Sequence, residues 1–218
     1  MKVINLSEHN SLLNQYLSEI RDEQIQKDPL RFRRNIERIG EVMAIEVSKA
    51  LDYRPTDVQT PLGVAKVNTI ADSVVLGTIL RAGLPLHHGF LNMFDRAENA
   101  FLSAFRRIGD NGQLEIVAEY MAAPSIEDKT LILVDPMLAT GMSMEIGYQA
   151  LLRHGKPRHA HLCCTIGTQQ AIDYLRHALN DDPDITVWCA AIDPVLNEKK
   201  YIVPGLGDAG DLCFGTKL

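Results

Sequence analysis

The chain has 218 residues, a formal net charge of −6 and 46% hydrophobic residues. It is therefore long and apolar enough to bury a substantial core as one domain, and its acidic balance argues against a general basic surface for nucleic acid or an anionic membrane. Charged and amide side chains interrupt the apolar residues at the N-terminus, and no later stretch is long enough to span a bilayer. These features predict a cytoplasmic globular protein without nucleic-acid or membrane partners.

A long amphipathic helix and a β-hairpin are predicted in the N-terminal third. Asp28-Pro29 is typical of an N-cap followed by a first-turn proline. Apolar residues then recur at helical spacing as far as about Leu51, and this stripe is interpreted as core or subunit interface: Phe32, Ile36, Ile39, Met43 and Val47. Between Arg54 and Ala71, the Pro-Leu-Gly sequence at residues 61–63 predicts the turn of a short hairpin.

Apolar runs in the rest of the chain predict buried parallel strands. They are residues 73–80, 131–135, 161–166 and 185–191. A helix is expected after the first run, from Leu84 to about Phe94, and one helical pattern fills each gap between the last three runs. This βαβαβ order implies right-handed crossovers and a parallel sheet, whose ligands bind beyond the carboxyl ends of the strands.

Other features have plainer interpretations. Residues 106–120, with glycine and asparagine at the centre, are predicted to form a mobile hairpin or flap. None of the four cysteines has Cys-x-x-Cys spacing, so they are interpreted as reduced packing residues, with Cys163 and Cys164 on opposite faces of a strand. His87 and His88 are adjacent, which is no metal-ligand spacing, and a solvated or locally hydrogen-bonded role is expected for them.

The sequence LILVDPMLATGMSM, residues 131–144, ends a buried strand with a carboxylate and a glycine-containing turn. Backbone N–H groups from about Ala139 to Ser143 would lie at a helix N-terminus, which suits a terminal phosphate, and Asp135 could accept hydrogen bonds from sugar hydroxyls. The glycine-rich motifs of nucleoside triphosphatases and dinucleotide enzymes are missing. This stretch alone leaves open a plain turn in which Asp135 and Thr140 are capping residues.

Four blocks of the sequence resemble the uracil phosphoribosyltransferase family in the same order. DPMLATG (135–141) is similar to its phosphoribosyl pyrophosphate motif and ILRAGLPLHHG (79–89) to its pyrophosphate loop. SAFRR (103–107) resembles the segment that precedes its flexible hairpin, and YIVPGLGDAGDLCFGTK (201–217) resembles its C-terminal uracil-binding segment. The resemblance covers essentially the whole chain, and the last block is the most specific.

The resemblance implies an α/β fold of the type I phosphoribosyltransferase kind, with a parallel sheet flanked by helices. A small hood from the N- and C-terminal segments and a flexible β-hairpin arm would complete it. One domain is expected over residues 1–218: N-terminal helices and hairpin in residues 1–70, the core sheet in residues 71–191 and a base-binding segment in residues 192–218.

Site residues follow from the same resemblance. Arg81 and Arg106 would contact pyrophosphate, with the register between Arg106 and Arg107 left open, and a non-proline cis peptide is predicted next to Arg81. Asp208 is the candidate acceptor for the uracil N1 proton and completes the catalytic set. Further contacts to phosphoribosyl pyrophosphate would come from Asp135, Pro136, Met137, Leu138, Ala139, Thr140, Gly141, Met142, Ser143 and Asp208. Uracil would be held by Ile202, Gly207, Asp208 and Ala209.

The implied reaction is transfer of ribose 5-phosphate from phosphoribosyl pyrophosphate to uracil, giving UMP and pyrophosphate in pyrimidine salvage. Mg²⁺ would be held through the substrate without direct protein ligands, and at least a homodimer is expected. Allosteric activation by GTP, which some family members show, is left open by the sequence. Two rivals stay open: a nucleotide-sensing regulatory or catalytically silent homologue, and a transferase for another base. Pro85 and Met142 stand where the family usually has glycine, and Met142 requires a negative φ and could narrow the phosphate site.

Overall fold

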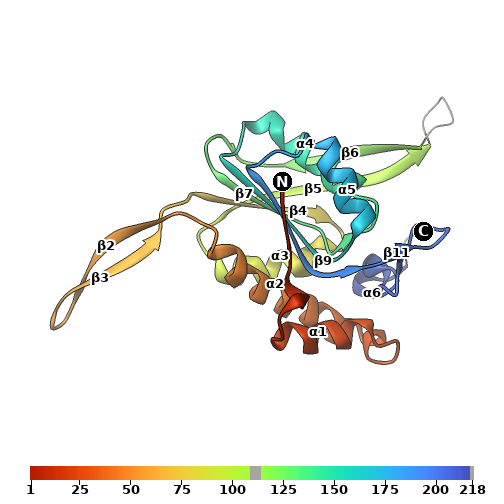
Figure 1. The fold of residues 1–218 in the computed structure, drawn as a ribbon, viewed down its shortest axis with the longest axis horizontal. Coiled ribbons are helices and arrows are strands. Elements are labelled where there is room, and N and C mark those ends of the chain that lie inside the picture. The colour runs from red at the N-terminus through yellow and green to blue at the C-terminus, as the bar shows by residue number, and fades with distance from the viewer. Residues whose placement is uncertain (109–113, 217–218) are drawn as a thin grey trace.

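A mostly parallel sheet with helices on both faces forms the body of the molecule (Figure 1). This computed structural model describes residues 1–108 and 114–216, without the side chains of residues 104–119. The strand order in the described residues is β1-β10-β9-β7-β4-β5-β6, with β8 paired to β9, and the β5–β6 hairpin supplies the antiparallel pair. The strands are β1 (Lys2–Asn5), β4 (Val74–Leu80), β5 (Glu98–Ile108), β6 (Leu114–Ala122), β7 (Thr130–Val134), β8 (Met137–Leu138), β9 (His159–Thr168) and β10 (Ile185–Asp193).

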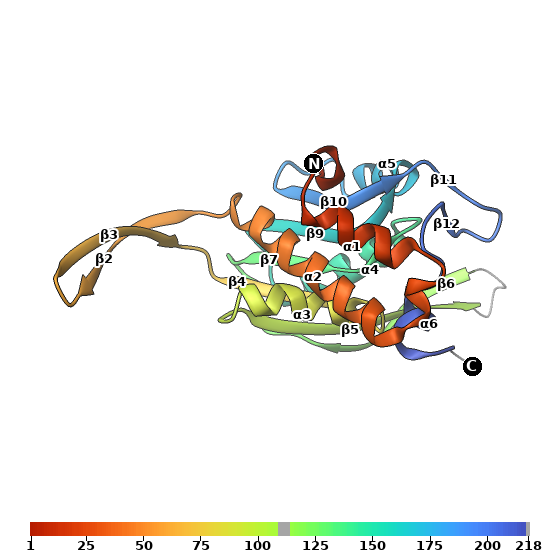
Figure 2. The ribbon, with the colours of Figure 1, turned by 90° about the horizontal axis from the view of Figure 1, so that it is seen from below.

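Helices cover the two faces of the sheet separately, as the turned view shows (Figure 2). One face carries α1 (Leu12–Arg21), α2 (Pro29–Ser48) and α3 (Gly83–Met93), and the other carries α4 (Met142–Leu151) and α5 (Gln169–Ala178). Short 3₁₀ turns are η1 (Leu6–Glu8), η2 (Ile25–Lys27) and η3 (Leu152–His154). The C-terminal segment adds β11 (Val195–Leu196), β12 (Ile202–Val203) and α6 (Ala209–Phe214). The predicted α/β architecture is confirmed.

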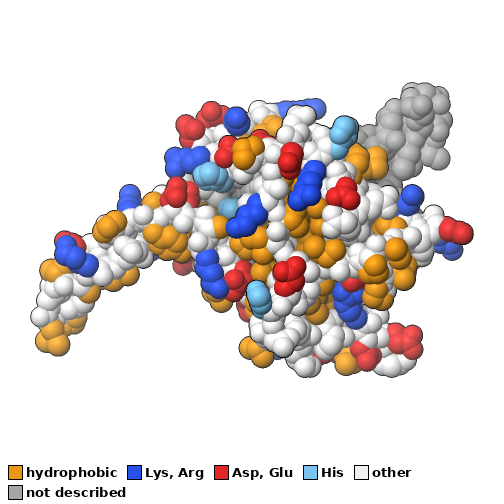
Figure 3. Space-filling model, in the orientation of Figure 1, with side chains coloured by type: hydrophobic (Ala, Val, Ile, Leu, Met, Phe, Trp, Pro, Cys, Tyr) orange, Lys and Arg blue, Asp and Glu red, His pale blue; other side chains and the backbone are white. Residues whose placement is uncertain are grey.

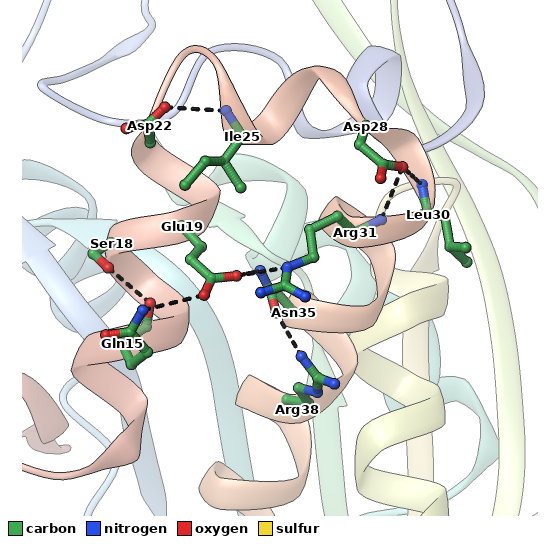
Figure 4. A network of polar contacts seen from close by, with 10 residues as sticks. All are labelled: Gln15, Ser18, Glu19, Asp22, Ile25, Asp28, Leu30, Arg31, Asn35 and Arg38. Carbon is green, nitrogen blue, oxygen red and sulfur yellow. Dashed lines mark hydrogen bonds and ion pairs between the residues drawn. The ribbon is translucent and has the colours of Figure 1, made fainter.

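The start of α2 is set by the predicted cap. The Asp28 side chain accepts hydrogen bonds from the backbone N–H groups of Leu30 (2.9 Å) and Arg31 (3.2 Å), and Pro29 is the first helical residue (Figure 4). The apolar stripe of this helix is buried in the core of the chain. Of the two interpretations of the stripe, core is therefore confirmed and subunit interface is not. The helix ends at Ser48, three residues earlier than expected.

The two faces of the sheet also separate the cysteines as strand alternation predicts. Cys163 packs in the core cluster beneath α1, α2 and α3, whereas Cys164 packs in the cluster beneath α4 and α5. All four cysteines are free and buried, which confirms their role as packing residues. The Sγ atoms of Cys164 and Cys189 lie 3.3 Å apart on adjacent strands.

Two hairpins leave the body of the molecule at opposite ends (Figure 1). The predicted N-terminal hairpin is confirmed as β2 (Tyr53–Thr60) and β3 (Gly63–Ile70), joined by Pro61 and Leu62. We call it the arm; apolar side chains are exposed along it and at its tip (Figure 3). The predicted flap corresponds to the β5–β6 hairpin, and its central residues 109–113 lie outside the described part of the chain.

The edge strand β1 was not predicted. Residues Lys2–Asn5 pair in parallel with Thr186–Cys189 of β10, and the Met1 amino group lies 3.0 Å from a carboxylate oxygen of Asp181. Four residues give too short a pattern to separate a strand from a loop, and the partner strand lies at the other end of the sequence. No helix within residues 1–108 and 114–216 combines the length and apolar character that crossing a membrane requires.

The backbones of α2 and α3 lie in close contact at Gly89. A Cβ atom on Gly89 would lie 2.0 Å from the Glu37 carbonyl oxygen and 2.9 Å from the Glu41 nitrogen. Gly89→Ala is therefore expected to destabilise the protein by about 3 kcal/mol in urea unfolding, since neither backbone can yield without separating the helices. Gly147→Ala in α4 is the matched control, because its Cβ would meet only the flexible ends of Leu102 and Ile79. Equal stability of the two variants would contradict this account.

Candidate active site

A cavity of about 400 Å³ lies at the carboxyl ends of the central strands, where an α/β sheet places its ligands. Three segments line it: the turn after β4, the turn after β7 and the C-terminal segment. The lining residues are Ile79, Leu80, Arg81, Ala82, Asp135, Met137, Ala139, Ser143, Lys199, Lys200, Tyr201, Ile202, Gly207, Asp208, Ala209 and Gly210. Residues predicted for phosphoribosyl pyrophosphate and for uracil therefore share one cavity.

The turn after β4 presents Arg81 to the cavity. The Leu80–Arg81 peptide is cis, as predicted. A Cβ on Gly83 would lie 2.3 Å from the Thr78 hydroxyl oxygen and 3.2 Å from the Val134 carbonyl oxygen, so a larger residue would push the turn off the sheet. Both Arg81 guanidinium Nη atoms donate to the Gly215 carbonyl oxygen at 3.4 Å, and Nη2 lies 3.6 Å from an Asp211 carboxylate oxygen. Arg81 thus reaches across the cavity to the C-terminal segment.

Asp135, directly after β7, combines burial with access to the cavity. Solvent reaches part of its side chain through the cavity, while protein atoms enclose the rest of the carboxylate. This burial raises the pKa of Asp135 from 3.8 to about 7, although a hydrogen bond from the Met137 backbone N–H opposes the shift. The backbone N–H of Asp135 donates to the Cys163 carbonyl oxygen at 3.1 Å, which anchors the turn to β9. A carboxylate held here can accept charge-assisted hydrogen bonds from hydroxyl groups.

The helix start after this turn does not fit a capping role for Thr140. The N-cap of α4 is Gly141, with φ 84°, and among the described residues no side chain caps the helix. Thr140 is therefore not a capping residue, and the first-turn N–H groups of α4 are left for another acceptor. The left-handed conformation falls on Gly141, so Met142 begins α4 with an ordinary helical backbone. Met142 does not line the cavity.

The C-terminal segment contributes the residues predicted for the base. Ile202 and Ala209 are buried at 4% and 3% exposure, while Asp208 is the N-cap of α6 and accepts from the Asp211 backbone N–H at 3.0 Å. Gly207 has φ 93°, and a Cβ there would meet no atom within 4 Å. Glycine is therefore favoured here by the backbone conformation and not by a lack of space. Val203–Pro204 is a cis X-Pro peptide.

Lysine side chains on the cavity were missed from the sequence. Lys199 and Lys200 line it beside Tyr201, in the turn between β11 and β12. The Asn197 side-chain oxygen holds this turn by accepting from the N–H groups of Lys199 (3.0 Å) and Tyr201 (2.9 Å), and Lys200 has φ 64°. The adjacent lysines before the glycine-rich block were the available signal. With Arg81 they place three cations around a cavity of an acidic chain.

Among the predicted residues whose side chains the structure describes, five do not line the cavity: Pro136, Leu138, Thr140, Gly141 and Met142. Leu138 is 2% exposed in the core, and the Pro136 carbonyl oxygen accepts from Thr165 and Ile166 of β9. The Leu138 side chain and the Pro136 carbonyl oxygen thus hold the turn against the core and β9. The Arg106 backbone pairs with Ile116 in the β5–β6 hairpin, but its side chain and that of Arg107 lie outside the described residues, so the register between them stays a prediction.

One of the two histidines differs from its expected role. His88 is exposed, as expected, but His87 is 1% exposed and packs 5.1 Å from the Phe101 ring centroid. The expectation of a solvated His87 is wrong because the ring is buried. A local hydrogen bond could come only from the nearby Asn99 side chain, and among the described side chains neither ring nitrogen has a partner in full hydrogen-bonding geometry. Burial lowers the pKa of His87 to about 4, and the nearby Asn99 amide only partly opposes this.

Comparison with known proteins decides the family. The model of the family described as uracil phosphoribosyltransferase matches residues 7–216, a range that includes all three segments around the cavity. The chain belongs to the uracil phosphoribosyltransferase family. Its cavity residues can therefore be considered as parts of a uracil phosphoribosyltransferase site.

Relatives and a solved structure agree along the full length. The uracil phosphoribosyltransferase of Porphyromonas gingivalis is 57% identical over 218 residues, all of both chains. That of Methanothermobacter thermautotrophicus is 37% identical over 208 residues, 94% of this chain and 93% of the relative. The solved structure of the AQ2163 protein from Aquifex aeolicus matches with a TM-score of 0.86 and 25% identity over 99% of both chains. The fold of this uracil phosphoribosyltransferase family member is thus shared from end to end.

Proposed function

We propose that the protein transfers ribose 5-phosphate from phosphoribosyl pyrophosphate to N1 of uracil, giving UMP and pyrophosphate, and so serves pyrimidine salvage. The whole chain acts as one domain in this reaction. The observation that carries the proposal is the shared cavity: Arg81, Asp135 and the start of α4 face the Gly207–Asp208–Ala209 segment across it. A donor and a base bound to these two sides would meet in one place.

The phosphoribosyl half of the proposed site is an arrangement of complementary charges. Arg81 binds the pyrophosphate, and the uncapped N-terminus of α4 beside Ser143 binds the 5-phosphate. Asp135 accepts hydrogen bonds from the ribose hydroxyls. As the bond from C1′ to pyrophosphate breaks, positive charge develops on the ribose and negative charge on the leaving group, and these groups stabilise both without a protein nucleophile.

The base half recognises uracil mainly through backbone groups. Uracil presents an N3–H donor between two carbonyl acceptors, which one backbone C=O and two N–H groups of residues 207–209 can match. Cytosine would leave buried backbone groups unpaired at two of these edges. The buried Ile202 side chain packs against the face of the ring. This pattern favours uracil over another base.

Mg²⁺ is part of the proposal as a substrate-held cofactor. Asp135 and Asp208 both line the cavity, and hard carboxylate oxygens suit Mg²⁺ and its bound waters. When bound, the ion neutralises charge on the pyrophosphate leaving group. Activation by GTP stays a prediction from the family resemblance.

Asp208 is proposed to accept the N1 proton of uracil, directly or through water. Asp208→Asn is expected to lower kcat/KM about 10- to 100-fold, because an amide cannot take the proton, while the cap of α6 survives since asparagine caps as well as aspartate. Steady-state kinetics across pH and a thermal melt measure both effects. Asp28→Asn, at the N-cap of α2 away from the cavity, is the matched control. Near-normal kcat/KM of Asp208→Asn across pH would contradict the role.

The function itself is tested by a panel of bases with phosphoribosyl pyrophosphate and Mg²⁺, followed by pyrophosphate release. Uracil-dependent release is expected. Release with a purine but not uracil would indicate a transferase for another base. Binding of nucleotide with no release for any base would indicate a nucleotide-sensing or catalytically silent homologue.

A homo-oligomer of at least two chains completes the proposal. The arm supports it, because a two-stranded hairpin that carries exposed apolar residues away from the body gains little stability alone; these residues are Tyr53, Val58, Leu62, Val64, Val67 and Ile70. Sedimentation equilibrium tests it, and a monomer at assay concentration would contradict it. A cytoplasmic location is also proposed, supported by four unpaired cysteines.

A further inference from the structure

A buried ion pair lies directly behind the base-binding segment. Asp193 is the last residue of β10 and is 5% exposed, and Arg21 is the last residue of α1. Arg21 binds the carboxylate with both ends of its guanidinium, Nη1 to Oδ2 and Nη2 to Oδ1, each at 2.8 Å. Neither residue lines the cavity.

The pair holds both backbone polar groups of one residue in the base-binding segment. Arg21 Nη1 donates to the Gly205 carbonyl oxygen at 3.0 Å, and the Gly205 backbone N–H donates to Asp193 Oδ2 at 2.8 Å. Gly205 is itself buried, with φ 57°. Both of its backbone polar groups thus form their hydrogen bonds with charged side chains, Arg21 and Asp193, which are 172 positions apart in the sequence.

Gly205 controls the spacing between the two sets of base contacts. It lies between Ile202 and residues 207–209, and the turn it makes is tight, since a Cβ on Gly205 would be 2.1 Å from the Ile202 carbonyl oxygen. A shift of Gly205 would move Ile202 relative to the Gly207–Ala209 backbone. Among the described residues, neither the turn after β4 nor the turn after β7 forms a hydrogen bond or ion pair with the Arg21 or Asp193 side chain, so both turns would stay in place.

We propose that Arg21 and Asp193 are positioning residues for base recognition, which fix Gly205 and thereby the geometry that selects the pyrimidine. The proposal rests on the proposed function. It assigns α1 a role in specificity, although this helix contributes no residue to the cavity. Bidentate geometry suits the task, because a planar guanidinium orients the carboxylate while a remaining N–H contacts Gly205.

The alternative is that the pair only anchors α1 to the sheet. A purely structural anchor would lower the melting temperature and leave the kinetic preference for uracil unchanged. A positioning pair would raise the KM for uracil, spare the KM for phosphoribosyl pyrophosphate and weaken discrimination against cytosine. The two accounts therefore differ in a ratio of kinetic constants that partial unfolding does not alter.

The test compares Asp193→Asn, Arg21→Lys and Arg21→Met. We expect Asp193→Asn and Arg21→Met to raise the KM for uracil about 10-fold, with less than about 2-fold change for phosphoribosyl pyrophosphate, as for the loss of one charge-assisted hydrogen bond. Arg21→Lys should recover part of this loss because it keeps the charge without the fork. Equal changes in both KM values, or lower melting temperature with unchanged KM for uracil, would overturn the proposal.

A neighbouring ion pair on the same helix supplies the control. Glu19 of α1 accepts from Arg31 Nε at 2.8 Å and from Asn35 Nδ2 at 2.7 Å, both on α2 (Figure 4). These hydrogen bonds lower the pKa of Glu19 to about 2, so the carboxylate is charged and paired at neutral pH. Arg31→Gln removes an anchor of α1 that does not contact residues 202–209, and its KM for uracil should not change.

Hydrogen exchange separates this proposal from the proposed function. In the wild-type protein without ligand, the Gly205 amide should exchange slowly because a buried carboxylate accepts its proton, and Asp193→Asn should speed its exchange. Wild type that releases no pyrophosphate with uracil would refute the function while leaving this exchange result standing. Active wild type with a rapidly exchanging Gly205 amide would refute the positioning role alone.

Discussion

Asp135→Asn is expected to lower kcat/KM for phosphoribosyl pyrophosphate about 10²–10³-fold. The amide loses the charge that offsets positive charge on the ribose, and it offers one acceptor oxygen where the carboxylate offers two. Steady-state kinetics with saturating uracil measure the loss. A KM for uracil within about 2-fold of wild type would show that the base half of the cavity is intact. An active Asp135→Asn enzyme would refute the assignment of this residue to the ribose.

The same substitution should stabilise the unliganded protein above neutral pH. Because the pKa of Asp135 is raised from 3.8 to about 7, the folded state keeps a proton that the unfolded state releases above about pH 4. Wild type therefore loses stability as pH rises from about 4 to 7, at up to about 1.4 kcal/mol per pH unit, and partial solvent access reduces the total to about 2 kcal/mol.

Chemical denaturation at several pH values measures how the buried Asp135 carboxyl group affects the free energy of unfolding. The difference in unfolding free energy between Asp135→Asn and wild type should grow from about pH 4 to 7 and then stay constant. A difference that is the same at every pH would mean that the carboxylate is not held in a desolvated site.

Arg81→Met is expected to lower kcat/KM for phosphoribosyl pyrophosphate by a similar factor, about 10²–10³-fold. Among the described residues, Arg81 is the arginine that lines the cavity. Removing its guanidinium leaves less positive charge to stabilise the pyrophosphate leaving group. Pyrophosphate inhibition should weaken in parallel, since the product contacts the same group. Kinetics with varied phosphoribosyl pyrophosphate and a product-inhibition series measure both effects.

Arg33→Met is the control for the contact that Arg81 makes with the C-terminal segment through the Gly215 carbonyl oxygen. Arg33 donates from Nη1 to the Cys213 carbonyl oxygen at 2.7 Å, so it also tethers the C-terminal segment, but it does not line the cavity. If Arg33→Met lost as much activity as Arg81→Met, the effect would come from a loosened C-terminal segment. Retained activity in Arg33→Met would assign the loss to the charge of Arg81 at the cavity.

Much of the site was predictable because its polar residues belong to short contiguous sequence motifs. Arg81, Asp135 and Asp208 each stand in a short motif, and the structure brings all three to one cavity. Residues whose role depends on which segments meet were not predictable. Lys199 and Lys200 stand directly before the glycine-rich block, but only the fold shows that this turn reaches the cavity. The burial of His87 likewise depends on packing against Phe101 of another element.

The helices and central strands of this protein were predictable from the sequence itself, through apolar periodicity and helix-capping residues. Apolar runs marked the central strands, Asp28 and Pro29 set the start of α2, and alternation separated Cys163 from Cys164, because each of these depends only on neighbouring residues. Family motifs identified the chemistry in the same local way.

Only the tertiary structure decided features that join distant parts of the chain. It placed β1 beside β10, enclosed Asp135 enough to raise its pKa, and closed Arg21 and Asp193 around Gly205. Burial and long-range hydrogen bonds depend on what packs against a residue from elsewhere in the chain, and neighbouring residues do not encode this. The sequence thus determined the motif residues of the site, and packing determined which further residues join them and the charge state and spacing in which they are held.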